Sequence, residues 1–259
     1  MYLCALLFCA VVAGVWADWK QDVLDEHNRL RSQVARGDQD GVSAAAYMAK
    51  LKWDDDLAAA AQQYVDGCPD GHDPALRDPN RQEKIGENYG GDGLDDVKLI
   101  VQNWYSEVNE GYPIDYASFD NVAFQAGHYT QLIWAKTSGL GCGYKKGCLM
   151  RGCMPNELMD CKINTLICRY KPSGNVLGEP IFEVGDMCDK CEGQCQDGLC
   201  DGQIKGGAAV EETKAAGGCS DQASNCAQLA SKGLCGFTGQ MAELNADALS
   251  MCRATCDRC

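Results

Sequence analysis

The sequence predicts a layered domain of helices around a small sheet, followed by two small regions held together by disulfide bonds. Helical spacings of three and four alternate with short strand-like runs up to about residue 175. Cysteines are sparse in this first region and crowded beyond residue 187. A region with few cysteines needs a hydrophobic core of its own, whereas a short cysteine-dense region is stabilised by its bridges.

Three helices and two strands are expected in the first region. Asp54 is expected to cap the second helix, and Asp95 and Asp96 to occupy the favourable first turn of a third helix over residues 94–108. Residues 140–144 and 165–170 are expected to form strands. The expected apolar helix faces are Trp19, Val23, His27, Leu30 and Val34 in the first helix, Leu57, Ala61, Tyr64 and Cys68 in the second, and Val97, Ile100, Val101, Trp104 and Val108 in the third.

One carboxylate interrupts the apolar face of the third helix. Glu107 lies seven positions after Ile100, about 20° from it around the helix axis. A carboxylate on a core face is costly unless it has partners. Glu107 is therefore either a buried residue that caps a neighbouring backbone or a ligand in a site.

The first seventeen residues, MYLCALLFCAVVAGVWA, are expected to be a signal peptide with cleavage after Ala17. The segment carries no charged side chain and is marginal in length for a membrane span, although an uncleaved anchor is the alternative. Val15 and Ala17 are small enough for the cleavage positions. Of the eighteen cysteines, sixteen follow this segment, an even number that allows eight disulfides in a secreted protein.

The charge balance disfavours nucleic acid and anionic membranes as partners. Thirty-seven acidic residues against twenty-three basic ones give a net charge of −14 and a pI near 4.6. Both polyanions attract basic surfaces. No later segment is long and apolar enough to span a membrane, and no Asn-x-Ser/Thr sequon occurs.

Four motifs within residues 18–176 resemble the CAP superfamily of cysteine-rich secretory proteins, venom allergens and plant pathogenesis-related proteins. Residues 127–137, GHYTQLIWAKT, match its first signature at every constrained position. Residues 165–176, TLICRYKPSGNV, resemble the second signature and depart from it at Thr165. His27-Asn28 with Arg31 resembles the N-terminal helix motif, and residues 86–88 the Gly-Glu-Asn motif.

This resemblance implies an α+β fold, a three-layer α-β-α sandwich with a central and largely antiparallel sheet. It also implies a cleft with two histidines and two acidic residues. Carried over by motif, these are His72, Glu87, Glu107 and His128. His27 belongs to the helix motif and is expected to be a packing residue.

Such a cluster suits zinc, because neutral imidazoles are good zinc ligands and carboxylates complete or orient the shell. The alternative is a His–Glu hydrogen-bond network that holds no metal. No catalytic residue is predicted, because the sequence has no Gly-x-Ser-x-Gly, no His-Glu-x-x-His and no unpaired cysteine. Hydrolysis by a zinc-bound water is the least favoured function.

The later cysteines resemble the remaining parts of a cysteine-rich secretory protein. Residues 177–202 resemble its hinge, for which a four-cysteine zinc site is a poor alternative, and residues 219–259 resemble an ShK-toxin-like (ShKT) domain. Residues 203–218 are expected to be a linker, with a short helix as the alternative. The implied disulfides, the first three being less firmly based, are Cys142–Cys168, Cys68–Cys148, Cys153–Cys161, Cys188–Cys195, Cys191–Cys200, Cys219–Cys259, Cys226–Cys252 and Cys235–Cys256. A usual CAP cysteine is replaced by Lys171.

The function expected from this architecture is that of a secreted, non-enzymatic protein that binds or modulates an extracellular target, such as an ion channel. A venom component is one such protein. Direct block of a potassium pore is disfavoured, because residues 219–259 carry four acidic against three basic residues and lack a Lys-Tyr pair before the fourth cysteine. The alternative is a CAP module that binds a lipid, sterol or protein in defence or reproduction. This alternative rests on an aromatic-rich segment that contains Tyr105, Tyr112, Tyr116, Phe119 and Phe124.

Overall fold

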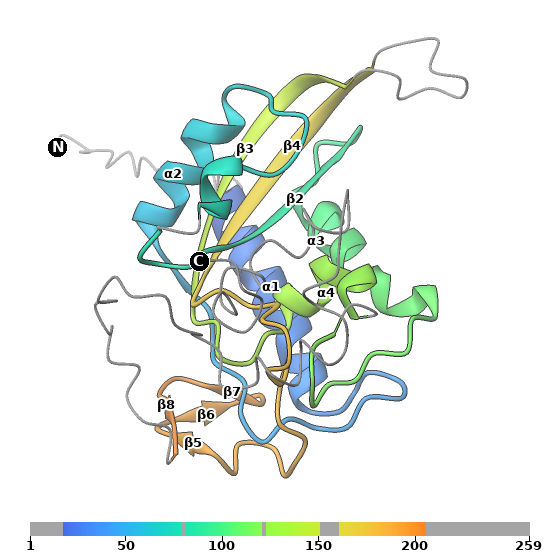
Figure 1. Ribbon diagram of the computed structural model, residues 1–259, viewed down its shortest axis with the longest axis vertical. Coiled ribbons are helices and arrows are strands. Elements are labelled where there is room, and N and C mark those ends of the chain that lie inside the picture. The colour runs from blue at the N-terminus through green and yellow to red at the C-terminus, as the bar shows by residue number, and fades with distance from the viewer. Residues whose placement is uncertain (1–17, 79–80, 121–122, 151–160, 206–259) are drawn as a thin grey trace, which may run out of the picture.

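The computed structural model describes residues 18–78, 81–120, 123–150 and 161–205 (Figure 1). The predicted signal peptide, most of the predicted linker and the predicted ShKT domain with its three cysteine pairs lie outside these ranges. Within the described part of the chain, no helix is long and apolar enough to cross a membrane.

A four-stranded, largely antiparallel sheet forms the centre of the first domain. Its strand order is β1-β3-β4-β2, in which β1 pairs with β3 in parallel and the other pairs are antiparallel. The two predicted strands are confirmed but are longer than expected, because the β3–β4 ladder continues past a register shift between Lys145 and Cys148. Strand β2 was not predicted, since its sequence GENYGGD has no apolar alternation. The bounds are β1 Lys52–Trp53, β2 Gly86–Asp92, β3 Gly139–Met150 and β4 Cys161–Lys171.

Helices cover both faces of this sheet and make the three-layer α-β-α sandwich that the sequence predicts (Figure 1). On one face, Ile167 of β4 packs against Ala61 and Val65 of helix α2. On the other face, Leu166 and Tyr170 belong to the main core with the remaining helices. The helices are α1 Trp19–Ala35, α2 Asp55–Val65, α3 Val97–Ser106 and α4 Gly127–Leu132, with short 3-10 turns η1 Pro74–Arg77, η2 Glu107–Glu110 and η3 Ala123–Ala126.

Aspartate side chains fix where the three long helices begin. Asp54 caps α2 as predicted, accepting hydrogen bonds from the backbone N–H groups of Asp56 and Leu57. The predicted range of the third helix was too long at both ends, because Asp96 is its N-cap and the helix ends at Ser106. A side chain that accepts from the N–H groups ahead of it holds its own residue in a non-helical conformation.

A buried arginine ties α1 to the end of α4. Arg31 is fully buried and donates to the main-chain carbonyls of Leu132 and Trp134, among others. Its guanidinium also donates twice to the carbonyl of Ala49. The bond to Leu132 satisfies the last carbonyl of α4, which has no partner within the helix, and the others hold the segments that follow α1 and α4. Burial lowers the pKa of Arg31 to about 9, so the side chain stays charged at neutral pH.

Two implied disulfides of the first domain are present. Cys68–Cys148 links the end of α2 to β3, and Cys142–Cys168 links β3 to β4. Cys161 is disulfide-bonded, and its predicted partner Cys153 lies outside the described residues. The core of this domain therefore has both apolar packing and covalent ties.

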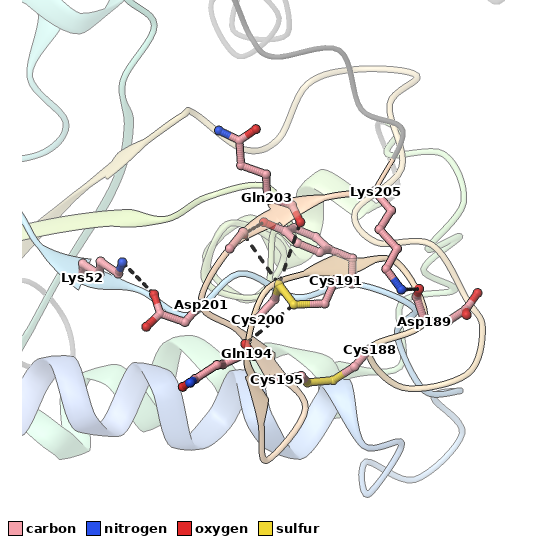
Figure 2. The surroundings of a disulfide bond; sticks show 12 residues. Lys52, Cys188, Asp189, Cys191, Gln194, Cys195, Cys200, Asp201, Gln203 and Lys205 are labelled. Carbon is pink, nitrogen blue, oxygen red and sulfur yellow. Dashed lines mark hydrogen bonds and ion pairs between the residues drawn. A yellow bond between two sulfur atoms is a disulfide. The ribbon is translucent and has the colours of Figure 1, made fainter.

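The hinge is a small double hairpin that carries both of its implied disulfides, Cys188–Cys195 and Cys191–Cys200 (Figure 2). Gln203–Ile204, the first residues of the predicted linker, form strand β8 and pair with β5. So short a pairing of strands is difficult to predict from the sequence, because it is made by main-chain hydrogen bonds and not by side chains. The strands are β5 Cys191–Glu192, β6 Cys195–Gln196, β7 Leu199–Cys200 and β8 Gln203–Ile204.

The hinge packs firmly on the first domain. The N–H of Cys200 donates to the carbonyl of Met48 at 2.7 Å, and its carbonyl accepts from Lys50 at 2.9 Å. Ser32 of α1 donates to the carbonyl of Asp197. Leu199 and Cys200 belong to the main hydrophobic core. The described residues from 18 to 205 thus form one packed unit.

Candidate functional site

The four residues predicted for the cleft come together at the edge strand of the sheet. Strand β2 supplies Glu87, and the loop after α2 supplies His72. Glu107 lies at the end of α3, and His128 lies in α4. Because β2 is the last strand in the sheet order, the helical layers on its two faces can both reach it. The site therefore combines residues from opposite layers.

The first pair is His72 and Glu87. The Nδ1 atom of His72 lies 3.1 Å from Oε1 of Glu87, and the same oxygen accepts from the N–H of Asp73 at 2.9 Å. Oε2 of Glu87 accepts from Nε of Arg169 at 3.2 Å. The Glu87 side chain is only 4% exposed, whereas that of His72 is 40% exposed. The carboxylate is thus a buried support for a ring that reaches solvent.

The second pair is His128 and Glu107. The Nδ1 atom of His128 lies 2.5 Å from Oε1 of Glu107, and Oε2 accepts from the N–H groups of His128 and Tyr129. These N–H groups are at the start of α4, where a carboxylate is favourable. Glu107 therefore caps a neighbouring backbone, which is one of the two interpretations of the sequence, and its other oxygen contacts the ring of His128.

Aromatic rings fix the planes of both histidines. The ring centroids of His72 and His128 are 6.5 Å apart at an interplanar angle of 29°. His128 also stacks on Trp104, with centroids 6.0 Å apart at 21°. Tyr89 contacts His72 edge-on at 6.2 Å. The two imidazoles thus face each other in a stack that begins in the core.

The donor set fits a metal held by two histidines. Each Nδ1 is engaged by a carboxylate, and neither Nε2 has a hydrogen-bond partner among the described residues. A histidine that bonds a carboxylate through one nitrogen is oriented and tautomer-fixed to bind a metal through the other. No group of three or more His, Cys, Asp or Glu residues that could hold a metal occurs in the described ranges. In the described structure, the oxygens of Glu87 and Glu107 are used by the histidine rings, by main-chain N–H groups and by Arg169, so these carboxylates orient the rings.

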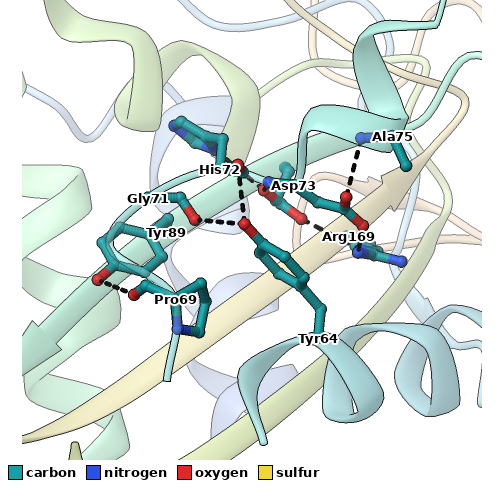
Figure 3. Close-up of polar contacts among 9 residues, drawn as sticks. Tyr64, Pro69, Gly71, His72, Asp73, Ala75, Tyr89 and Arg169 are labelled. Atoms are coloured by element: carbon teal, nitrogen blue, oxygen red, sulfur yellow. Dashed lines mark hydrogen bonds and ion pairs between the residues drawn. The ribbon is translucent and has the colours of Figure 1, made fainter. Parts of the chain in front are cut away.

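Sequence reasoning missed two charged residues beneath the cleft. Arg169 pairs with both Glu87 and Asp73, and Asp73 directly follows His72 in the chain. Figure 3 shows Arg169 beside Asp73, with the Tyr64 hydroxyl donating to the carbonyls of Gly71 and His72. The sequence signal that could have identified Arg169 was its position in the second signature. The pairing of β2 with β4 places it directly opposite Glu87.

A buried polar chain supports the cleft from the core side. His27 is fully buried, with Nδ1 2.8 Å from the carbonyl of Val23 and Nε2 2.9 Å from the hydroxyl of Tyr170. Asn88 donates to that hydroxyl and to the carbonyl of His128. Burial lowers the pKa of His27 to about 4. His27 is thus the neutral packing residue that the sequence predicts, and Asn88 ties it to the site.

The aromatic segment that suggested a lipid site contributes to the core. Tyr105 packs edge-on against Tyr129, and Phe119 packs against both Phe124 and Trp134. Tyr116 packs against Phe182. Tyr112 is the exposed ring of the segment, at 36%. The other four rings fill space between helices and loops.

Comparison with known proteins decides the family. The model of the cysteine-rich secretory protein family (CAP) matches residues 24–154. The chain belongs to the CAP family. Scoloptoxin SSD976 from Scolopendra dehaani is 36% identical over 183 residues, which are 70% of this chain and 81% of the relative. The cysteine-rich venom protein of Tityus serrulatus is 33% identical over 198 residues, 73% of this chain and 46% of the relative.

Solved CAP structures share this fold. The crystal structure of NaASP2 with Zn²⁺ aligns with a TM-score of 0.56 at 30% identity, covering 70% of this chain and 93% of that protein. BmVAL-1 aligns with a TM-score of 0.55 at 28% identity, covering 71% and 90%. The matching family is one of secretory proteins. The relatives include venom proteins of centipede, scorpion and ant.

Proposed function

We propose that this CAP protein is a secreted, non-enzymatic binding protein whose cleft holds a divalent metal, with zinc as the preferred ion. The observation that carries the proposal is the paired geometry of the histidines. His72 and His128 face each other, each has Nδ1 on a carboxylate, and each leaves Nε2 free within the described structure. The crystal structure of the related NaASP2 with Zn²⁺ supports the choice of ion.

The residues of the cleft divide the work of binding. His72 and His128 are the two ligands, while Glu87 and Glu107 accept the Nδ1 protons and keep the rings in place. Zinc bound there would supply a cationic centre with positions left for water or for a group of a partner. The site is part-exposed on its histidine side, with 40% and 32% of the two side chains accessible.

The described residues near the cleft support binding over catalysis. Ser106, adjacent to Glu107, is the nearest hydroxyl in sequence, but it donates to the carbonyl of Asn103 in its own helix. A serine nucleophile needs an adjacent base within hydrogen-bond reach. Within the described residues, no hydrogen bond joins Ser106 to either cleft histidine, so this hydroxyl has no such base among its described contacts.

A zinc titration by calorimetry at pH 7.4 tests the proposal. The wild-type chain is expected to bind zinc, and a His72→Ala/His128→Ala variant is expected to lose that binding. Arg36→Gln is the control, because it removes an exposed charge that pairs with Asp38 and has no described contact with the cleft residues. Binding that survives in the double variant, or is absent from the wild type, would refute the metal site.

The target we propose is an extracellular protein, with an ion channel as the first class to test. The venom relatives support this proposal, as does the ShKT-like cysteine pattern of residues 219–259. Voltage-clamp recording on calcium, potassium and ryanodine-type channels is the direct measurement. We expect modulation without potassium-pore block. Absence of any effect at micromolar concentration across the panel would refute the channel target and leave the metal site standing.

A further inference from the structure

Arg169 lies beneath the cleft and contacts two of its acidic neighbours. The residue pairs with Glu87 in the β2–β4 register, so both side chains project from the same face of the sheet. Its Nε donates to Oε2 of Glu87 at 3.2 Å, and its Nη2 donates to Oδ2 of Asp73 at 2.5 Å. The guanidinium also lies over the ring of Tyr64, 5.9 Å from the centroid. The Arg169 side chain is only 6% exposed.

The two carboxylates that Arg169 joins are themselves largely buried. The side chains of Glu87 and Asp73 are 4% and 16% exposed. Two like charges at this depth repel each other and are poorly solvated, so they need a shared cation. Among the described residues, Arg169 is the cation with an ion pair to both.

Glu87 contacts the His72 ring directly, whereas Asp73 acts on the loop that carries His72. Glu87 divides its oxygens, since Oε1 contacts Nδ1 of His72 and the N–H of Asp73, while Oε2 is taken by Arg169. Asp73 follows His72 in the chain, and its Oδ1 accepts from the N–H of Ala75 at the start of η1. Arg169 thus fixes the rotation of the carboxylate that orients the ring and also anchors the loop that carries it (Figure 3).

The other half of the cleft is built differently. Glu107 is satisfied by the N–H groups of His128 and Tyr129 at the start of α4, and no ion pair with an arginine or lysine is found for it in the described structure. Only the His72 half, therefore, depends on a buried guanidinium. A change at Arg169 should disturb one histidine and leave the other in place.

We propose that Arg169 is a positioning residue for His72, which keeps Glu87 and Asp73 together so that the ring is held ready to bind metal. The inference rests on the proposed metal site. Loss of the guanidinium leaves two buried carboxylates without their cation, so Glu87 turns away from His72. Removal of an outer-shell partner of this kind commonly weakens metal binding about 10–100-fold.

The test compares zinc affinity in three variants by calorimetry at pH 7.4, using the full chain. Arg169→Gln is expected to weaken zinc binding at least about 10-fold. An added Asp73→Asn change removes one of the two like charges, so the double variant is expected to recover affinity to within about three-fold of wild type. Arg36→Gln, which removes an arginine from the exposed ion pair with Asp38, is the matched control and should bind as wild type.

The outcomes separate this inference from the proposed function. Because Asp73→Asn relieves the same charge repulsion in the fold, the guanidinium unfolding midpoint of each variant is measured beside its zinc affinity. Weak zinc binding by an Arg169→Gln chain that is still folded supports the inference, and so does recovery in the double variant. Wild-type affinity in Arg169→Gln would overturn the inference and leave the metal site intact, as would a double variant as weak as the single one. A wild-type chain that binds no zinc would overturn both.

Discussion

The buried histidine of α1 makes a quantitative prediction about acid stability. His27 is fully buried and its pKa is lowered from the ordinary value of 6.5 to about 4 by burial. In the unfolded chain, the imidazole takes up a proton below about pH 6.5, whereas the folded chain resists protonation until about pH 4. The unfolded state therefore binds more protons in this range, and the free energy of unfolding falls as the pH is lowered.

The size of the loss follows from the two pKa values. At about 1.4 kcal/mol per pH unit, the interval from 6.5 to about 4 corresponds to about 3 kcal/mol by pH 4. That is a large part of the 5–15 kcal/mol typical of a folded domain. Other groups also titrate in this range, so the contribution of His27 has to be isolated by difference.

The contribution of His27 is isolated by comparing wild type with His27→Gln. Both proteins are unfolded in guanidinium, with the disulfides intact, at several pH values between 7.5 and 4. Glutamine can still donate to the carbonyl of Val23 and accept from the hydroxyl of Tyr170, but it does not titrate. We expect the variant to be less stable at pH 7.5 and the difference to shrink by about 3 kcal/mol on acidification. Parallel pH profiles for the two proteins would refute the reasoning.

Three further predictions concern the cleft, the sheet and the hinge. Glu107→Ala should lower the free energy of unfolding by about 1–3 kcal/mol in guanidinium titrations, because two N–H groups of α4 lose their acceptor; an unchanged midpoint would contradict the capping role. Gly141→Ala should lower the free energy of unfolding in the same titrations by about 1–3 kcal/mol or more, because the added Cβ would lie 2.3 Å from the backbone nitrogen of Ala58. Gly71→Ala is the control and should be nearly neutral, because nothing lies within 4 Å of its added Cβ. The two hinge disulfides should be reduced in order when the reductant is limiting. Alkylation and mass spectrometry should find Cys188 and Cys195 labelled before Cys191 and Cys200, because Cys195 is exposed and the second pair is buried. Simultaneous labelling would show that solvent access does not control the reduction.

Local patterns in the chain predicted α1, α2 and, with bounds that were too wide, α3, whereas α4 Gly127–Leu132 was not predicted. The spacing of Val23, Leu30 and Val34 predicts α1 because one helix face must be apolar to pack on a sheet, and these residues are buried. Glu107 was conspicuous for the same reason, as a carboxylate on an apolar face. His72, Glu87 and His128 could be named through motif resemblance, and the fold brings all four together.

What the sequence could not provide was the pairing of distant segments. Strand β2 has no apolar alternation, because it is an edge strand rich in glycine. Arg169 meets Glu87 only through the β2–β4 register, and strand β8 forms only through its main-chain hydrogen bonds to β5. Local periodicity reports which face of an element is apolar, and it carries no information about which strand lies beside it.

The sequence by itself thus determined the family, the α-β-α layering and the identity of the four cleft residues, because these depend on motifs and on local periodicity. The tertiary structure alone decided how the four residues divide into two His–Glu pairs, which carboxylate caps a helix, and which rests on a buried arginine. Those assignments depend on strand register and on contacts between residues 15 to 96 positions apart.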